Sequence, residues 1–263
     1  MRGRGREVLE RVRAGDVLVF DGGYGTMLFA AGLANGACPE LWNDTHAEIV
    51  RGIHRAYFEA GSQIVETNTF GGSRLKLDEG VTDEAYEATF REQAEALATG
   101  GVDLFAIETM MFPQEAVAAV RACKQAADLP VMATMFFQYE EGNDRDRTMW
   151  GESPAEVAKS LLAAGADVVG MNCGRGPDRA IVIIREMRGA TDAPLVAYPN
   201  AGLPITTGDT VTYELGPDAM AREYPALLEA GCNIVGACCG SNPEHIRRIA
   251  AVVRGRTRAP GRG

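Results

Sequence analysis

The sequence predicts an α/β fold, a (β/α) barrel of the TIM type. Four stretches repeat one order, in which a helix ends in Ala-Gly or Gly-Gly, a buried apolar strand follows, and polar residues close the unit: EAGSQIVETN, ATGGVDLFAIET, AAGADVVGMNC and EAGCNIVGACC. Apolar strands that alternate with helices are typical of a parallel sheet covered by helices. A length of 263 residues suits one such barrel, so we expect residues 1–263 to form a single domain.

Seven segments are expected to be the strands of this barrel: residues 17–21, 63–68, 103–108, 130–136, 167–172, 194–199 and 233–238. A closed barrel of this type has eight strands. Nothing between Phe70 and Val81 is typical of a strand followed by a helix. We therefore predict an incomplete or open barrel of about seven strands, with its gap covered by a second subunit.

Several helix boundaries are marked by capping residues. Ser153 precedes Pro154 and lies three residues before Glu156, which is the pattern of a capping box with proline at the first helical position. Asn242 precedes Pro243 in the same way and is expected to begin the last helix. The two basic ends of the chain are predicted to be frayed.

Polar side chains gather where the predicted strands end. In barrels of this class the chemistry lies at the carboxyl ends of the strands. The residues found there are Asp21, Glu66, Asn68, Glu108, Asn172, Cys173, Cys238 and Cys239. Asp21 is followed by Gly22 and Gly23, and such a glycine turn lets backbone N–H groups approach a bound anion.

The cysteines predict a metal site. Side chains of neighbouring strand residues point to opposite faces, so Cys238 and Cys239 can reach one target only if the chain bends between glycines. Cys173 ends a similar run, and three soft sulfur ligands from two strand ends suit a zinc ion whose fourth position stays open for substrate. Packing is the alternative, because free cysteine is often buried, and it is our interpretation of Cys123 and Cys232.

Composition excludes several classes of partner. The formal net charge of −10 and the isoelectric point of about 4.9 argue against nucleic acid and against an anionic membrane surface. No stretch is long and apolar enough for a transmembrane span, and no signal-peptide pattern is present. With six cysteines scattered along a chain of this size, we expect reduced thiols and a cytoplasmic protein.

Taken together, the motifs resemble the homocysteine S-methyltransferase family, which includes the homocysteine-binding domain of cobalamin-dependent methionine synthase. The resemblance runs from Asp21 to Ile246 and rests on DGGYGTM, CPELWNDTHAEIVRGIHRAYFEAGSQIVETNTFGG, AIETM, GMNCGRGP, YPNAGLP and VGACCGSNPEHI. YPNAGLP and NCGRGP are similar to the methionine synthase branch. Family members usually carry an extra helix and strand after ETNTF, and this chain lacks them.

The resemblance implies transfer of a methyl group to the thiol of homocysteine, which gives methionine. It implies zinc on Cys173, Cys238 and Cys239, the substrate ammonium near Asp21 and Glu108, and the carboxylate near Gly22 and Gly23, with the pocket lined further by Glu66, Thr67, Asn68 and Asn172. Glu66 and Glu108 also fit the role of structural carboxylates. No general base is assigned, because zinc would itself lower the pKa of the thiol.

The methyl donor stays open. No folate or corrinoid domain is recognisable in the sequence, so we expect the donor to be a methyl-corrinoid on a separate protein. The alternatives are a small donor such as S-methylmethionine or a betaine, a folate on a partner, and a non-catalytic subunit that keeps the zinc site and binds a partner. The charged run from Glu140 to Arg147 is expected to be a solvated loop, or else a contact with a donor protein.

Overall fold

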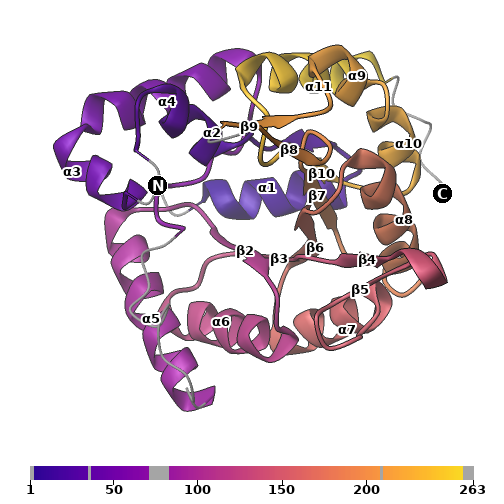
Figure 1. Cartoon of the computed structure of the whole chain (residues 1–263). Helices are drawn as coiled ribbons and strands as arrows, with labels where there is room; N and C mark the ends of the chain where they lie inside the picture. Colours follow the sequence, from indigo (N-terminus) through magenta and orange to yellow (C-terminus); the bar gives the residue numbers. More distant parts are fainter. Residues whose placement is uncertain (1–2, 35–36, 71–82, 208–209, 257–263) are drawn as a thin grey trace.

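The computed structural model describes residues 3–34, 37–70, 83–207 and 210–256. A six-stranded sheet forms its centre, and every strand pair in that sheet is parallel. The strand order is β1-β10-β7-β6-β3-β2, and Figure 1 shows the helices surrounding it. The bounds are β1 (Leu18–Val19), β2 (Phe105–Met110), β3 (Val131–Met135), β6 (Val168–Cys173), β7 (Leu195–Pro199) and β10 (Ile234–Val235).

Eleven α-helices and two short 3-10 helices are present in the described residues. They are α1 (Arg4–Arg13), α2 (Tyr24–Ala30), η1 (Pro39–Leu41), α3 (Trp42–Thr45), α4 (Ala47–Ala60), α5 (Asp83–Gly100), α6 (Pro113–Ala126), η2 (Glu141–Asn143), α7 (Pro154–Ala164), α8 (Pro177–Arg188), α9 (Pro217–Ala221), α10 (Tyr224–Glu229) and α11 (Pro243–Gly255). The predicted capping box at Ser153 is confirmed, and Asn242 caps α11. None of these helices combines the length and the apolar character that a bilayer span requires.

The core has two layers, as expected for a barrel. The inner layer fills the space enclosed by the strands with side chains such as Leu18, Met132, Val168, Val196 and Ile234. Leu9 and Val12 of α1 belong to this inner cluster, so α1 covers one end of the barrel. The larger outer cluster lies between the sheet and the surrounding helices. This arrangement leaves the opposite, carboxyl end of the strands open for a site.

Among the described residues the sheet does not close into a barrel, as the strand count predicted, but one predicted strand is wrong. Residues 63–68 form no strand; they run beside β1, where Gln63 and Ile64 donate their backbone N–H groups to Val19 O at 2.8 and 3.3 Å. No strand pairing joins this segment to β2 within the described residues. Two consecutive N–H groups donate to the one carbonyl of Val19, and Val19 N donates to the side-chain Oε1 of Gln63 at 3.2 Å, so the evenly spaced backbone ladder of a parallel pair does not form.

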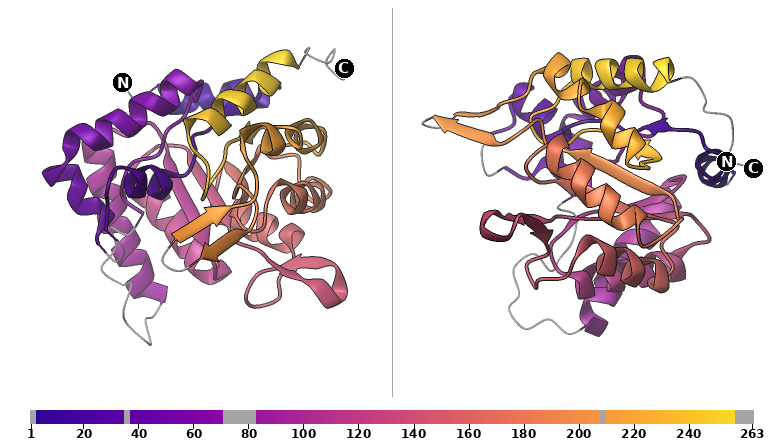
Figure 2. Two further views of the ribbon diagram at one scale, coloured as in Figure 1. Left: turned by 45° about the horizontal axis from the view of Figure 1, so that its top comes forward. Right: turned by 90° about the vertical axis from the view of Figure 1, so that its right-hand side faces the viewer.

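Two antiparallel hairpins lie outside the central sheet: β4 (Gln138–Glu140) with β5 (Arg145–Arg147), and β8 (Pro204–Thr207) with β9 (Thr210–Tyr213). Figure 2 shows both projecting from the same side of the molecule. Residues 140–147, predicted to be a solvated loop, are mostly exposed but belong to the first hairpin, and within it Asp146 is buried and paired with Arg179 of α8. The predicted frayed carboxyl end, from residue 257, and most of the stretch without a predicted strand, residues 71–82, lie outside the described residues.

Candidate metal centre and substrate pocket

Three cysteines from two strand ends lie together. Cys173, at the end of β6, has its Sγ 3.1 Å from Cys238 Sγ, and Cys238 Sγ is 3.9 Å from Cys239 Sγ. All three sulfurs lie within 4.8 Å of one another. The structure therefore brings together the three thiols that the sequence singles out. It also places Cys123 and Cys232 in the core, as predicted.

The end of β7 connects the two cysteine loops, because β7 lies between β6 and β10 in the sheet. Asn200 accepts a hydrogen bond from Cys239 N at 3.0 Å with Oδ1 and donates from Nδ2 to Gly174 O at 2.8 Å. Pro199 O accepts from Cys238 N at 2.8 Å, and Ala201 N donates to Cys239 O at 2.9 Å. These bonds fix the distance between the loops before any ligand is bound.

Asn172 anchors the backbone beside Cys173. Its Oδ1 accepts from Thr109 N at 2.7 Å and from Thr134 Oγ1 at 2.8 Å, and its Nδ2 donates to Thr109 Oγ1 at 2.6 Å. Asn172 is fully buried, and these contacts use its amide group. The structure thus gives Asn172 a positioning role, and Nδ2 also lies 3.8 Å from Cys173 Sγ and 4.0 Å from Cys238 Sγ.

Hydrogen bonding distributes the protons unevenly over the three thiols. Hydrogen bonds from Cys173 and Cys238 lower the pKa of Cys239 to about 3, and the Tyr213 hydroxyl on β9 adds a further hydrogen bond. Hydrogen bonds to Cys173 and Cys239, together with burial, raise the pKa of Cys238 well above its usual value. The hydrogen bonds around Cys239 thus favour the thiolate form of this residue over those of its two neighbours.

The sulfur positions fit a tetrahedral ion. Zinc–sulfur bonds of about 2.3 Å in a tetrahedron separate the sulfurs by roughly 3.8 Å, and the distances found here lie on either side of that value. An all-cysteine donor set selects soft or borderline metals such as zinc over magnesium or calcium. The donor set and its spacing therefore suit zinc.

Three carboxyl groups lie next to the thiols: Asp21 after β1, Glu66 in the segment beside it, and Glu108 on β2. Glu108 Oε1 accepts from Tyr198 Oη at 3.0 Å, and Asp21 Oδ2 accepts from Glu66 N at 2.9 Å. Burial raises the pKa of all three carboxyls, and the charges of Glu108 and Asp21 raise that of Glu66 further. Asp21 Oδ1 is buried and has no hydrogen-bond partner among the described residues. A cation placed here would satisfy these groups.

The glycine turn is required by close packing. A Cβ on Gly22 would lie 2.8 Å from Ser241 Oγ, and one on Gly23 would lie 2.7 Å from Cys238 O. Gly23 N donates to Ser241 Oγ at 2.8 Å, so this N–H group is already engaged. Only glycine allows the β1 turn to approach the cysteine loop so closely.

Thr67 and Asn68 make local contacts. Thr67 Oγ1 bonds Thr69 Oγ1 at 2.7 Å, and Asn68 donates from Nδ2 to Pro39 O at 2.8 Å and to Asn43 Oδ1 at 3.1 Å. Asn68 therefore holds the η1–α3 segment, and its amide is directed away from the thiols. Thr67 does line the cavity that begins at Glu66 and Glu108.

The sequence did not single out several residues that the fold adds to the site: Tyr198, Thr134, Asn200, Tyr213 and Ser241. Asn200 and Ser241 lie inside motifs quoted for the resemblance, and Tyr198 and Thr134 lie on predicted strands. Their roles depend on contacts between strands that are distant in sequence. Strand-end position was the signal that could have identified Tyr198 and Asn200.

The comparisons with known proteins agree with this geometry. The family model described as homocysteine S-methyltransferase matches residues 18–88 and 75–253, which is most of the chain. The chain belongs to the homocysteine S-methyltransferase family. The predicted family is therefore confirmed, and with it the prediction of a methyltransferase. The two matched pieces overlap at 75–88, in the region where we expect the usual helix and strand of this family to be missing.

Two curated relatives of this homocysteine S-methyltransferase family member are methionine synthases, from Mycobacterium leprae and Mycobacterium tuberculosis. Each is 27% identical over 292 residues, which covers 90% of this chain and 24% of the relative. The chain thus spans about a quarter of the length of these relatives.

Solved structures of the homocysteine methyltransferase MmuM from Escherichia coli have a similar fold. The metallated form matches with a TM-score of 0.70 at 20% identity, covering 90% of this chain and 96% of that protein. The oxidised form matches with a TM-score of 0.73 at 21% identity, covering 93% and 99%. At these identities the likeness supports the α/β barrel-type fold.

Proposed function

We propose that this chain is a zinc-dependent S-methyltransferase that transfers a methyl group to the thiol of homocysteine and gives methionine. The observation that carries the proposal is the convergence of three thiols from two strand ends, all within 4.8 Å, beside three carboxyl groups, of which Asp21 is buried and Glu66 and Glu108 are partly buried. A soft-metal site next to an ammonium site matches a substrate with a thiol at one end and an amino group at the other. The name of the curated relatives, methionine synthase, supports homocysteine as the acceptor.

Cys173, Cys238 and Cys239 would hold the zinc ion. When bound, zinc would lower the pKa of the acceptor thiol and so supply a nucleophilic sulfur at neutral pH. The protein's own contribution is to hold the three thiols in place through Asn200 and Asn172. In the transfer, a carbon–sulfur bond forms at the acceptor and the bond between the methyl group and the donor breaks.

The carboxyl groups would orient the acceptor. Asp21 Oδ1 has no partner among the described residues, and Glu108 is held by Tyr198 Oη. A substrate ammonium would favour the ionised form of these carboxyls, because an opposite charge within a few ångströms lowers the pKa of a buried acid. Binding of the amino group therefore stabilises charges that burial alone disfavours.

For the donor, we propose a methyl-corrinoid carried by a separate protein. Supporting this choice, large apolar side chains are exposed after the ends of β2 and β5: Met111, Phe112, Met149 and Trp150. Phe112 and Trp150 form an edge-to-face pair with centroids 6.0 Å apart. Exposed apolar clusters often mark protein interfaces. A small donor such as S-methylmethionine or a betaine is the alternative.

A donor panel tests the proposal. Zinc-loaded protein is incubated with homocysteine and, in separate reactions, a methyl-corrinoid protein, S-methylmethionine, a betaine and methyl-folate, and methionine is quantified. We expect turnover with the methyl-corrinoid protein. Turnover only with a small donor would overturn the donor assignment, and zinc binding without turnover on any donor would support a non-catalytic zinc-binding subunit. Binding of homocysteine sulfur to zinc, followed by X-ray absorption, tests the acceptor site independently.

A further inference from the structure

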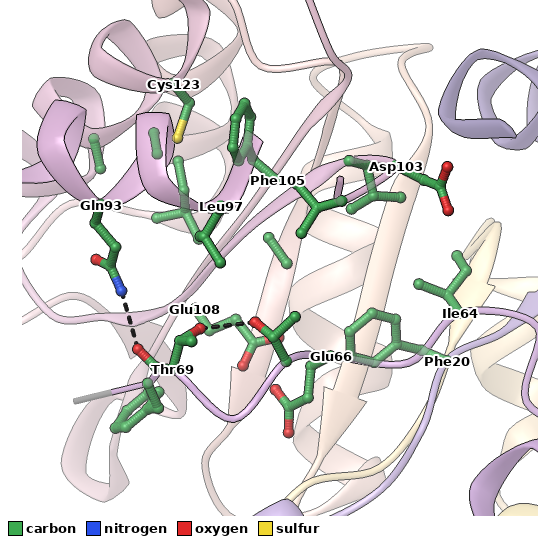
Figure 3. A pocket seen from close by; sticks show the side chains of 18 of the residues that line it. Phe20, Ile64, Glu66, Thr69, Gln93, Leu97, Asp103, Phe105, Glu108 and Cys123 are labelled. Carbon is green, nitrogen blue, oxygen red and sulfur yellow. Dashed lines mark hydrogen bonds between the residues drawn. The ribbon is translucent and has the colours of Figure 1, made fainter. Parts of the chain in front are cut away.

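A cavity of about 680 Å³ lies between the segment beside β1 and the edge of β2. It begins beside Glu66, Glu108 and Thr109 and extends to Asp103 near α1, and Figure 3 shows Glu66, Glu108 and Asp103 along it. Homocysteine has eight non-hydrogen atoms, so even at the ~30 Å³ that one water takes in the liquid it would occupy roughly 240 Å³. The cavity is thus much larger than the proposed acceptor requires.

The walls of the cavity beyond the carboxyl groups are mainly apolar. The inner cluster of the core contributes Phe20 and Ile64. The outer cluster, between the sheet and the helices, contributes Phe90, Leu97 and Phe105. The gap in the barrel wall therefore joins the inner layer of the core to the outer one. Apolar cavities of about 300–1,000 Å³ with a few polar groups at one end are typical of small-molecule sites.

Ala106 shows that the space continues directly from the substrate site. Successive strand residues point to opposite faces, so Ala106 lies on the same face of β2 as Glu108. Ala106 is exposed and lines the cavity, whereas every residue of β3, the next strand in the sheet, is buried. The wall behind Glu66 and Glu108 is open, and no other described strand fills it.

From this continuity, and resting on the proposed function, we infer that the acceptor site takes amino-thiols whose amino group carries an apolar substituent, which lies in the cavity beside Ala106. A secondary ammonium keeps the positive charge that Glu66 and Glu108 would bind. The substituent would contact the aromatic and aliphatic walls and remove apolar surface from water. Homocysteine itself would leave this part of the cavity to solvent.

The test compares homocysteine with N-benzylhomocysteine by isothermal titration calorimetry on the zinc-loaded full chain. We expect the benzyl compound to bind wild-type protein at least tenfold more tightly than homocysteine. Ala106→Phe fills the cavity and should reduce this preference at least tenfold, and the smaller Ala106→Leu should reduce it by an intermediate amount. Ala163→Phe, on the exposed face of α7 away from the cavity, is the matched control and should leave the preference unchanged.

The outcomes separate this inference from the proposed function. Binding of homocysteine without binding of N-benzylhomocysteine would overturn the inference and leave the proposed function standing. Equal loss of preference in Ala163→Phe, or full preference in both Ala106 variants, would also overturn it. Binding of neither compound would overturn the proposed function and the inference together.

Discussion

Thr109 Oγ1 lies 3.8 Å from Cys173 Sγ, and both residues have left-handed backbone, with φ of 55° and 60°. Left-handed backbone is uncommon for residues with a branched or bulky side chain and costs of the order of 1–3 kcal/mol each. Thr109 and Cys173 lie side by side at the ends of β2 and β6, so the backbone is strained at two neighbouring positions of the site. Asn172 bonds both the backbone and the side chain of Thr109 and so holds this arrangement.

We expect Asn172→Ala to destabilise the protein by about 2–4 kcal/mol, because it leaves the Thr109 N–H and the buried Thr134 hydroxyl without this acceptor. Urea unfolding of the metal-free protein measures the change. Asn143→Ala, on the exposed η2 turn, serves as the control and should change the free energy of unfolding by less than about 0.5 kcal/mol. A loss in Asn172→Ala no larger than in this control would contradict the anchoring role.

Cys239→Ala should abolish zinc retention and methyl transfer together, because two thiols cannot complete the set of protein ligands. Zinc content after dialysis, measured by mass spectrometry, and methionine formation are the two readouts. Cys232→Ala removes a cysteine that packs in the core near the same strand. This control should lose some stability and keep its zinc, and retained zinc in Cys239→Ala would refute the ligand assignment.

Asn200→Ala should weaken zinc binding about 10–100-fold, the usual cost of losing a group that orients metal ligands. Asn200 joins the loop of Cys239 to that of Cys173 through its two side-chain hydrogen bonds. Competition with a chromophoric chelator at several pH values gives the affinity. Affinity should also rise with pH in wild-type protein, because the raised pKa of Cys238 means that zinc must displace a proton there. A zinc affinity that is unchanged in Asn200→Ala would show that the loops hold their spacing without it.

Glu66→Gln should stabilise the folded protein at pH 8 by at least about 1 kcal/mol. Burial, and then the charges of Glu108 and Asp21, raise the pKa of Glu66 in the folded state. A raised carboxyl pKa favours folding only while the group is protonated, so its contribution is present below the unfolded pKa and is lost as pH rises toward the folded one.

The stabilising effect of Glu66→Gln should therefore shrink between pH 8 and pH 4, which thermal unfolding across this range would show. Glu59→Gln, on the exposed surface of α4, is the control and should show no such trend. We also expect Glu66→Gln to weaken homocysteine binding, because the carboxylate that destabilises the folded protein is also a group proposed to bind the substrate ammonium. A variant less stable than wild type at pH 8 would contradict the assignment of Glu66 as an acid whose pKa is raised by the folded protein.

Arg179→Ala should destabilise the protein by about 3–5 kcal/mol, because it leaves Asp146 buried without its partner. Arg179 also stacks on the Tyr139 ring, with Cζ 4.1 Å from the ring centroid. Arg175→Ala is a close control, since Arg175 stacks on the same ring at 5.0 Å and pairs with the exposed Glu141. Similar melting temperatures for the two variants would show that the hairpin does not depend on the buried pair.

The sequence by itself determined the alternation of strands and helices along the chain and the three cysteines of the candidate metal site. Alternation of helices with apolar strands predicted the parallel sheet, and the cysteines at the ends of two strands predicted the sulfur cluster that the structure contains. These features can be predicted because the alternation of side chains along a strand depends only on neighbouring residues. The carboxyl ends of parallel strands, in turn, lie at the same end of the barrel.

Only the tertiary structure decided what depends on contacts between distant segments. Residues 63–68 have the composition of a strand, yet two of their consecutive N–H groups share Val19 O in place of a regular ladder, and no pairing with β2 forms among the described residues. Asn68 and Asn172 both end predicted strands, but the packing around them turns one toward η1 and the other into the network beside Cys173. Sequence position places a side chain at the end of a strand, and only the three-dimensional neighbours determine its partner.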